Sequence, residues 1–249
     1  MKLFYSNTIE DDILLLPQEE AVHCFRVLRH KIGDQINVID GKGNLYLCEI
    51  LDTKSGSARI ISKKENFGSH PYNIHIAVAP TKNTDRFEWF LEKATEIGID
   101  RISPIICKHS ERKVLKAIRG QRIILSAVKQ SLKAYLPLYD DAISFEDFIK
   151  EFNADDKNSE VLKYIAFCDE ELISKEGFER KSISEAVEHI SSAKKSCIFL
   201  IGPEGDFSPQ EALTAMKSGF TPISLGSSRL RTETAALYAV AAVNLYNQD

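Results

Sequence analysis

Two stretches near the C-terminus decide the fold: Ile198 to Gly205 reads IFLIGPEG, and Pro222 to Ala235 reads PISLGSSRLRTETA. Each opens with a short apolar run that fits a buried strand, and each continues into a glycine turn. Between them, Ser208-Pro209-Gln210-Glu211 forms a capping box with proline at the first helical position, which predicts a helix ending at Gly219. The pattern is strand, helix, strand, as in a parallel α/β sheet.

The second stretch leads into one more predicted helix. We expect Thr232 to cap an alanine-rich helix that runs to about Tyr246. Ligands of open α/β sheets bind beyond the carboxyl ends of the strands, where these glycine turns and this helix start would meet. Glycines let a flat ligand approach the backbone, whose free N–H and C=O groups can recognise an adenine edge. Tight turns without a ligand remain the alternative for either glycine loop alone, and no Gly-Lys-Ser/Thr follows, which excludes a P-loop.

The alternation of strands and helices begins near residue 71. Apolar Ile74 to Ala79 predicts a strand, the apolar positions from Phe87 to Ile97 have helical spacing, and Ile102 to Ile106 predicts a second strand. Gly98 supplies the stop of the helix between them. This is a β-α-β unit, and the apolar stripe of its helix is interpreted as core rather than as a cofactor site.

The N-terminal part has a different, β-rich pattern. Gln35 to Ile39 and Leu45 to Leu51 alternate in polarity around a turn containing Gly41 and Gly43, which predicts a hairpin. The two glycines are not a dinucleotide fingerprint, since Tyr46 stands where its third glycine is needed. Residues 65–71 interrupt all periodicity, so we expect domains at residues 1–70 and 71–249.

Composition restricts the class of protein. The chain has 249 residues, a formal net charge of −4 and 43% hydrophobic content, values typical of a soluble globular protein of one large or two small domains. Its five cysteines are an odd number without a close pair, which fits neither a zinc site nor a disulfide framework. No signal-peptide core follows Met1, and the apolar stretch Thr234 to Tyr246 is too short to span a bilayer. We expect a cytoplasmic protein without membrane contact.

Charge is segregated along the chain despite the modest average. Between Arg101 and Lys133 there are nine basic residues and one acidic residue, whereas residues 140–160 hold eight acidic residues and two lysines. A solvated helix face is the ordinary interpretation of a basic run. Segregation this strong also suits an electrostatic footprint for an RNA phosphate backbone.

Several motifs together resemble the 16S ribosomal RNA uridine N3-methyltransferase family. The signature at the C-terminal end consists of Gly202-Pro203-Glu204-Gly205, Leu225-Gly226 and Leu230-Arg231-Thr232-Glu233-Thr234-Ala235. Further matches fall in the family's order at His23, Val27-Leu28-Arg29, Gly33-Asp34, Lys82, Lys93-Ala94-Thr95-Glu96-Ile97-Gly98, Ser110-Glu111-Arg112, Ala127, Gln130-Ser131 and Pro137. Residues 140–195 are the least family-like part.

The resemblance implies both a fold and an activity. The implied fold is α/β: a SPOUT methyltransferase domain with a C-terminal deep trefoil knot at residues 71–249, preceded by a small PUA-like RNA-binding β-barrel at residues 1–70. The implied activity is methylation of N3 of a specific uridine in 16S rRNA with S-adenosyl-L-methionine. The partners implied are 16S rRNA or the small ribosomal subunit and a second copy of the chain in a homodimer, and no metal is expected.

Site residues follow from the same resemblance. The expected catalytic residues are Arg231 and Arg112, which would stabilise charge on the uridine carbonyls, and Glu233, a candidate base that we rank as an organiser of its loop. The expected cofactor-binding residues are Leu200, Gly202, Glu204, Gly205, Leu225, Gly226, Leu230, Arg231, Thr232, Thr234 and Ala235. The expected RNA-binding residues are Arg26, Arg29, Lys82, Arg112, Lys116, Arg119 and Lys133.

Three residues depart from the family pattern. Asp206 stands where a second glycine is expected, and Asp tolerates a positive φ better than most residues. Lys2 and Lys133 stand where arginine is expected, so the charge is kept without the bidentate fork.

Three alternatives to this function stay open. They are a 2′-O-ribose or other base methyltransferase of the same superfamily, a non-catalytic RNA-binding module, and a small-molecule enzyme that uses the same loops.

Overall fold

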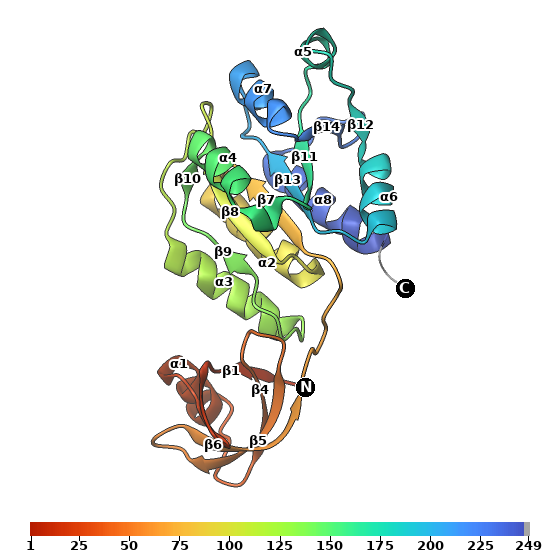
Figure 1. Cartoon of the computed structure of the whole chain (residues 1–249). Helices are drawn as coiled ribbons and strands as arrows, with labels where there is room; N and C mark the ends of the chain where they lie inside the picture. Colours follow the sequence, from red (N-terminus) through yellow and green to blue (C-terminus); the bar gives the residue numbers. More distant parts are fainter. Residues whose placement is uncertain (247–249) are drawn as a thin grey trace. The chain divides into compact units, whose positions relative to one another are not determined.

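A computed structural model of the chain describes residues 1–246, which fold into two compact units (Figure 1). Unit 1 contains Met1–His70 together with Ile124–Leu136. Unit 2 contains Pro71–Ile123 and the chain from Pro137 onward. The chain first changes unit after His70, near the linker expected from the sequence. Residues 124–136 differ from the expectation of a C-terminal domain at residues 71–249, because they pack in unit 1.

Unit 1 is built on one six-stranded sheet with the strand order β1-β4-β5-β6-β3-β2. Its strands are β1 (Leu3–Tyr5), β2 (Thr8–Glu10), β3 (Ile13–Leu15), β4 (Gln35–Ile39), β5 (Leu45–Asp52) and β6 (Ser57–Lys64). Helix α1 (Gln18–Val22) continues into the π-helix η1 (His23–Val27). β1 pairs with β4 in parallel and the other pairs are antiparallel, so the predicted hairpin between β4 and β5 is confirmed.

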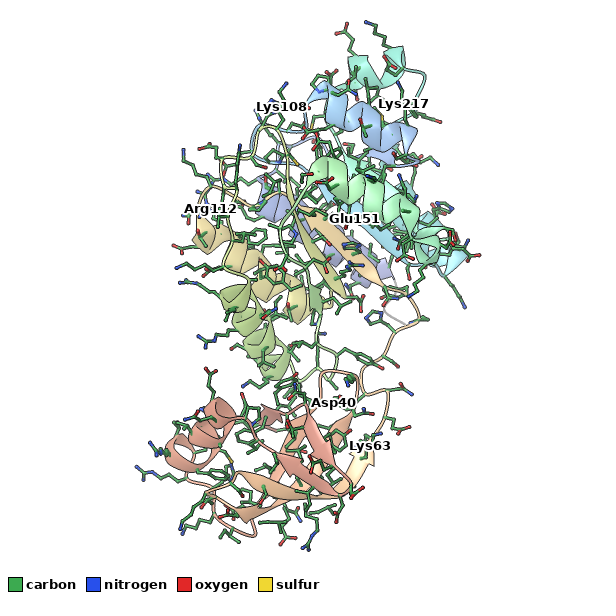
Figure 2. All side chains as sticks on the ribbon, turned by 60° about the vertical axis from the view of Figure 1, so that its left-hand side comes forward. Asp40, Lys63, Lys108, Arg112, Glu151 and Lys217 are labelled. Atoms are coloured by element: carbon green, nitrogen blue, oxygen red, sulfur yellow. The ribbon has the colours of Figure 1, made fainter. Side chains whose placement is uncertain are left out.

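The turn between β4 and β5 explains why residues 124–136 belong to unit 1. Asp40 is buried and accepts hydrogen bonds from the backbone and side chain of Asn44, and it is marked in Figure 2. Gly43 N donates to Ala134 O at 3.0 Å, and a Cβ on Gly43 would lie 2.2 Å from the Tyr135 ring. Gly43 also has φ +94°. Glycine is therefore needed both for the turn and for the close approach of Tyr135.

Unit 2 contains a parallel sheet in the order β10-β8-β7-β13-β11-β14-β12, with β9 paired to β8. Its strands are β7 (Ile74–Val78), β8 (Arg101–Ile106), β9 (Leu138–Tyr139), β10 (Ile143–Ser144), β11 (Leu162–Ala166), β12 (Lys181–Ser182), β13 (Cys197–Ile201) and β14 (Thr221–Ser224). Every residue of β7 and β13 is buried, as expected for strands covered on both faces.

Helices cover both faces of this sheet. The helices that lie wholly in unit 2 are α2 (Thr84–Ile97), α4 (Phe145–Ala154), α5 (Glu170–Lys175), α6 (Ile183–Ala193), α7 (Pro209–Lys217) and α8 (Thr232–Tyr246), with a 3-10 helix η2 (Asp156–Asn158). Helix α3 (Ala117–Gln130) begins in unit 2 and belongs to unit 1 from Ile124 onward. α4 and α7 pack on one face, and α2, α6 and α8 pack together on the other (Figure 1). The predicted β-α-β unit, now β7-α2-β8, is confirmed.

The C-terminal helices test the predicted caps. The capping box is confirmed at α7, where Ser208 Oγ accepts from Glu211 N and the Glu211 carboxylate accepts from Ser208 N. The predicted cap of α8 is wrong: Thr232 is the first residue of that helix, and its buried hydroxyl donates to Gly202 O at 3.0 Å. A contact across 30 residues of sequence thus replaces the local cap.

A buried polar chain at the start of β7 and β8 leads to a prediction about stability. His75 Nε2 donates to Ser103 Oγ at 2.7 Å, Ser103 donates to Asp140, and Arg101 Nε also donates to Asp140 at 2.8 Å. Burial and the nearby Arg101 charge lower the pKa of His75 to about 3, with Asp140 acting in the opposite direction. His75 is therefore neutral in the folded protein at neutral pH.

The free energy of unfolding is expected to decrease as the pH is lowered, because the unfolded imidazole, with a pKa near 6.5, binds a proton that folded His75 does not. No stability is lost to this group above about pH 6.5. Between about pH 6.5 and pH 3 the loss grows as the pH falls, and at about pH 5 it amounts to about 2 kcal/mol. His75→Gln should remove this difference. Urea unfolding at about pH 7 and pH 5 measures it; an equal loss of stability in the wild type and the variant would contradict the assignment to His75.

Candidate functional site

The main candidate site is a cavity of about 660 Å³ in unit 2. Its walls are the segments that follow β11, β13 and β14, together with the first turn of α8. These segments lie at the carboxyl ends of three neighbouring parallel strands, the edge where α/β sheets bind ligands. The volume is typical of small-molecule sites, which measure about 300–1,000 Å³.

Most of the residues that we expected to bind a cofactor lie in this cavity. Those that line it are Gly202, Glu204, Leu225, Gly226, Leu230, Arg231, Thr232 and Ala235. Three others are placed elsewhere. Leu200 is fully buried in the core, Gly205 contacts His109, and Thr234 lines a smaller neighbouring cavity.

Packing accounts for the glycines of the first loop. A Cβ on Gly202 would lie 3.1 Å from the ring and backbone nitrogen of Phe207. A Cβ on Gly205 would lie 3.2 Å from His109, whose Nδ1 is 3.2 Å from Gly205 O and 3.0 Å from Asp206 O. These glycines let the loop fold tightly against its neighbours, which leaves its other side to form the cavity wall.

Gly226, in the second loop, has a different role. Its φ is +119°, and a Cβ there would meet nothing within 4 Å. Few residues other than glycine adopt such a φ. A side chain at Gly226 would therefore strain the loop and enter open space at the cavity wall.

Asp206 meets the conformational requirement inferred from the sequence. Its φ is +63°, so the position does need the left-handed region, which Asp tolerates. The side chain also lines the cavity, and its Oδ1 accepts from Phe207 N at 2.8 Å. Burial raises the pKa of Asp206, while hydrogen bonds from Phe207 and Cys168 and the Arg229 charge act against that shift.

The three expected catalytic residues have different surroundings. Arg231 lines the cavity, and its guanidinium has no hydrogen-bond or ion-pair partner within residues 1–246. Arg112 instead donates to the carbonyls of Thr81 and Lys82, at 2.7 to 3.3 Å, and so holds the loop that follows β7. Glu233 is buried beside the smaller cavity. Arg231 is thus the member of the set that faces the large cavity.

The expected RNA-binding residues are divided between the two units. Arg26, Arg29 and Lys133 belong to unit 1, and Lys82, Arg112, Lys116 and Arg119 belong to unit 2. Several are already paired: Lys82 with Glu111 at 2.7 Å, and Arg119 with Glu88 through two contacts of 2.5 and 2.7 Å. Within the described chain, Lys116 has no such partner and is exposed. The ammonium of Lys116 is therefore available to a phosphate.

Sequence reasoning missed one whole wall of the cavity. Ala166, Phe167, Cys168 and Arg180 also line it, and all four come from the stretch that matches the family least. Their strand, β11, lies between β13 and β14, although it precedes both in sequence. The apolar alternation of residues 162–167 could have predicted a strand, but nothing in the sequence indicated where that strand lies in the sheet.

Neither a membrane-spanning helix nor a cluster of metal-binding side chains is found within residues 1–246. No helix within residues 1–246 is both long and apolar enough to cross a membrane. In the same range, no group of three or more His, Cys, Asp or Glu side chains is arranged to hold a metal ion.

Comparison with known families identifies the chain. Residues 68–244 match the family model of an RNA methyltransferase domain, and residues 16–61 match that of an RNA methyltransferase PUA domain. The chain belongs to this RNA methyltransferase family. The family resemblance seen in the motifs is confirmed, as is the class of enzyme. The cavity of this methyltransferase lies within the matched catalytic domain.

Solved structures and curated relatives agree with this assignment. A probable rRNA-methyltransferase from Porphyromonas gingivalis is 37% identical, with a TM-score of 0.81 over 99% of this chain and 98% of that one. A ribosomal RNA small subunit methyltransferase E from Neisseria gonorrhoeae, solved bound to S-adenosyl methionine, is 28% identical, with a TM-score of 0.76 over 98% and 97%. The protein of that name from Rickettsia conorii is 28% identical, covering 96% of this methyltransferase and 93% of the relative. The predicted α/β methyltransferase fold with an N-terminal PUA-like domain is confirmed.

Proposed function

We propose that this methyltransferase transfers a methyl group from S-adenosyl-L-methionine to N3 of a uridine in 16S ribosomal RNA. The observation that carries the proposal is the single cavity formed by two glycine loops and the start of α8 at the carboxyl ends of β11, β13 and β14. Relatives named ribosomal RNA small subunit methyltransferase E, one solved with S-adenosyl methionine, supply the substrate and the cofactor class.

The residues present fit that cofactor. The open space beside Gly226 is room that any side chain would occupy, and the glycine loops expose backbone groups suited to an adenine edge. The residues proposed to hold the cofactor are the predicted ones that line the cavity other than Arg231, together with Asp206 and the wall that follows β11. When bound, S-adenosyl-L-methionine supplies an activated methyl group on a sulfonium, a good leaving group.

The chain's own groups must orient the base and compensate its charge. Neutral uridine has no available lone pair at N3, so methylation requires loss of the N3 proton. We assign Arg231 to stabilise the negative charge that develops on the uridine carbonyls, because it lines the cavity and its guanidinium has no partner in the part of the chain that the structure describes. Arg112 is assigned to hold the loop after β7 and, with Lys82, to approach RNA.

The remaining parts of the proposal concern topology and assembly. A trefoil knot is supported by the order of the elements: β14 lies outside β11, yet α8, which follows β14, packs back on α2, β7 and β13. A homodimer is supported by apolar side chains of α8 that remain exposed, namely Tyr238, Leu245 and Tyr246. We also propose a cytoplasmic location, which the proposed action on ribosomal RNA supports.

A methylation assay tests the function. Purified protein and labelled S-adenosyl-L-methionine are incubated with naked 16S rRNA, with assembled small subunits, or without RNA, and the modified nucleoside is identified by mass spectrometry. We expect N3-methyluridine at one position. A 2′-O-methylated nucleoside would instead indicate a ribose methyltransferase. Absence of methylation together with no calorimetric heat from the cofactor would indicate an RNA-binding module.

Lys116 gives a separate prediction about RNA binding. Lys116→Glu should weaken RNA binding by about tenfold at low salt and reduce the slope of log affinity against log salt by about 1, because one phosphate contact is lost. Arg119→Glu should have a smaller effect, since Glu88 already neutralises that guanidinium.

Filter binding over a range of salt concentrations measures these effects. Lys217→Glu is the matched control, because Lys217 is also exposed but lies on α7, outside the basic run (Figure 2). Affinity that does not depend on salt, or equal losses in the Lys116 and Lys217 variants, would refute the footprint.

A further inference from the structure

A second, smaller cavity of about 350 Å³ lies beside the first turn of α8. It is lined by Asp85, Arg86 and Trp89 of α2 and by Glu233 and Thr234 of α8. The sequence motifs drew attention only to the two residues of α8. Because Arg231 and Thr232, which immediately precede them, line the large cavity, the two cavities are neighbours along the chain.

Glu233, which lines this cavity, has an unsatisfied hydrogen-bonding group. Its side chain is only 8% exposed, and its Oε2 is the one buried side-chain nitrogen or oxygen within residues 1–246 that has no hydrogen-bond partner. A buried carboxylate oxygen without a donor is unfavourable. Because Glu233 lines the cavity, a ligand that brings an N–H or O–H donor to its carboxylate would relieve this cost.

Arg86 connects this carboxylate to the large cavity. Its Nε lies 3.9 Å from Glu233 Oε1, and its Nη1 lies 3.9 Å from Glu204 Oε1, which belongs to the large cavity. At these distances Arg86 forms ion pairs but no hydrogen bonds with either residue. Its N–H groups are thus free to donate to an acceptor placed next to Glu233.

Trp89 supplies a flat wall. Its side chain is 44% exposed, which is unusual for so large an apolar residue, and it lines the same cavity as Arg86 and Glu233. Unpaired bases stack on aromatic side chains of this kind in RNA-binding proteins. The cavity therefore combines an aromatic face with the guanidinium donors of Arg86 and the carboxylate acceptor of Glu233.

We propose that this second cavity binds the target uracil, with the base stacked on Trp89, a carbonyl accepting from Arg86 and N3–H donating to the Glu233 carboxylate. This inference rests on the proposed uridine methylation and adds the residues that select the base. Uracil presents an N–H donor at N3 beside carbonyl acceptors, which matches the pair Glu233 and Arg86. Cytosine has an unprotonated N3 that would face the carboxylate oxygen without a hydrogen, so the same pair should reject it.

The test uses the intrinsic fluorescence of Trp89, the only tryptophan of the chain. Full-length protein is titrated with an oligoadenylate carrying one central uridine, and with matched oligonucleotides carrying cytidine or N3-methyluridine there. We expect saturable quenching by the uridine oligonucleotide with at least about tenfold tighter binding than by the other two. Glu233→Gln, whose amide can also donate to the cytosine N3, should reduce the preference for uridine over cytidine by about tenfold.

Kinetics provide a second readout. Trp89→Ala should raise KM for RNA by about tenfold with little change in kcat, and Trp89→Phe, which keeps a stacking face, should restore KM to within about threefold of the wild type. Equal quenching by all three oligonucleotides would overturn the proposal. So would Trp89 fluorescence that changes with protein concentration but not with RNA, since a second copy of the chain would then cover Trp89.

Failure of this inference can be distinguished from failure of the proposed function. If the wild type forms N3-methyluridine but neither quenching nor KM responds at Trp89, the base-binding cavity is rejected and the function stands. If uridine-selective quenching is present but no N3-methyluridine forms, the function is rejected and the base-binding cavity stands.

Discussion

Replacing Arg231 with alanine is expected to lower the methylation rate of RNA by about 10²–10³-fold, while S-adenosyl-L-methionine binds within a few-fold of the wild-type affinity. The reason is that Arg231 lines the large cavity and its guanidinium has no hydrogen-bond or ion-pair partner among residues 1–246. Its charge is therefore available for the negative charge that forms only as N3 loses its proton. An interaction made mainly in the transition state affects kcat rather than binding.

Single-turnover kinetics with excess enzyme measure this effect without a contribution from product release. Arg231→Lys is the matched comparison, since lysine keeps the charge but loses the planar fork, and an intermediate rate is expected. Calorimetry with the cofactor on each variant verifies the intact pocket. A single-turnover rate near that of the wild type in Arg231→Ala would exclude the role assigned to this residue.

The second large effect is expected at Gly226. Gly226→Ala should weaken cofactor binding by about 10–100-fold, because a Cβ is strained at φ +119° and the loop must shift where it forms the cavity wall. A non-glycine residue in such a conformation costs about 1–3 kcal/mol. The strain should lower the affinity for S-adenosyl-L-methionine, because the second loop faces the ligand rather than the core.

Gly219 provides a matched control for this prediction. It also has a positive φ, +89°, and a Cβ there would likewise meet nothing within 4 Å, but it lies after α7 and does not line the cavity. Gly219→Ala should therefore lower the melting temperature with cofactor affinity unchanged. Isothermal titration and thermal unfolding of both variants separate the two effects, and equal affinities would contradict the role of Gly226.

Much of the fold was predictable because it is encoded locally. The hairpin of β4 and β5, the β7-α2-β8 unit and the capping box at Ser208 depend on residues close in sequence. The positive φ of Asp206 could also be anticipated, since a motif glycine marks a backbone requirement rather than a contact. The prediction of a cap at Thr232 was wrong because a carbonyl from a distant strand end, that of Gly202, accepts its hydroxyl hydrogen.

The candidate site was only partly predictable. The glycine loops could be assigned because a tight turn or a close approach of the backbone requires glycine, and the glycines are visible in the sequence. Arg86, Trp89 and Arg180 could not, because an arginine or tryptophan on a helix or loop has many ordinary roles. Neither the unpartnered oxygen of Glu233 nor its pairing with Arg86 is visible before the two helices α2 and α8 are packed together.

By itself, the sequence determined that an α/β domain of a methyltransferase family presents two glycine loops and a helix start at one sheet edge. Tertiary structure alone decided that β11 lies between β13 and β14, that its end completes the cavity, and that residues 124–136 pack on the turn at Gly43. The physical reason is the sequence separation over which each kind of interaction acts. Propensities, caps and turns act over a few residues, whereas strand order and buried polar contacts join groups that are distant in sequence, and only the folded chain fixes which of them meet.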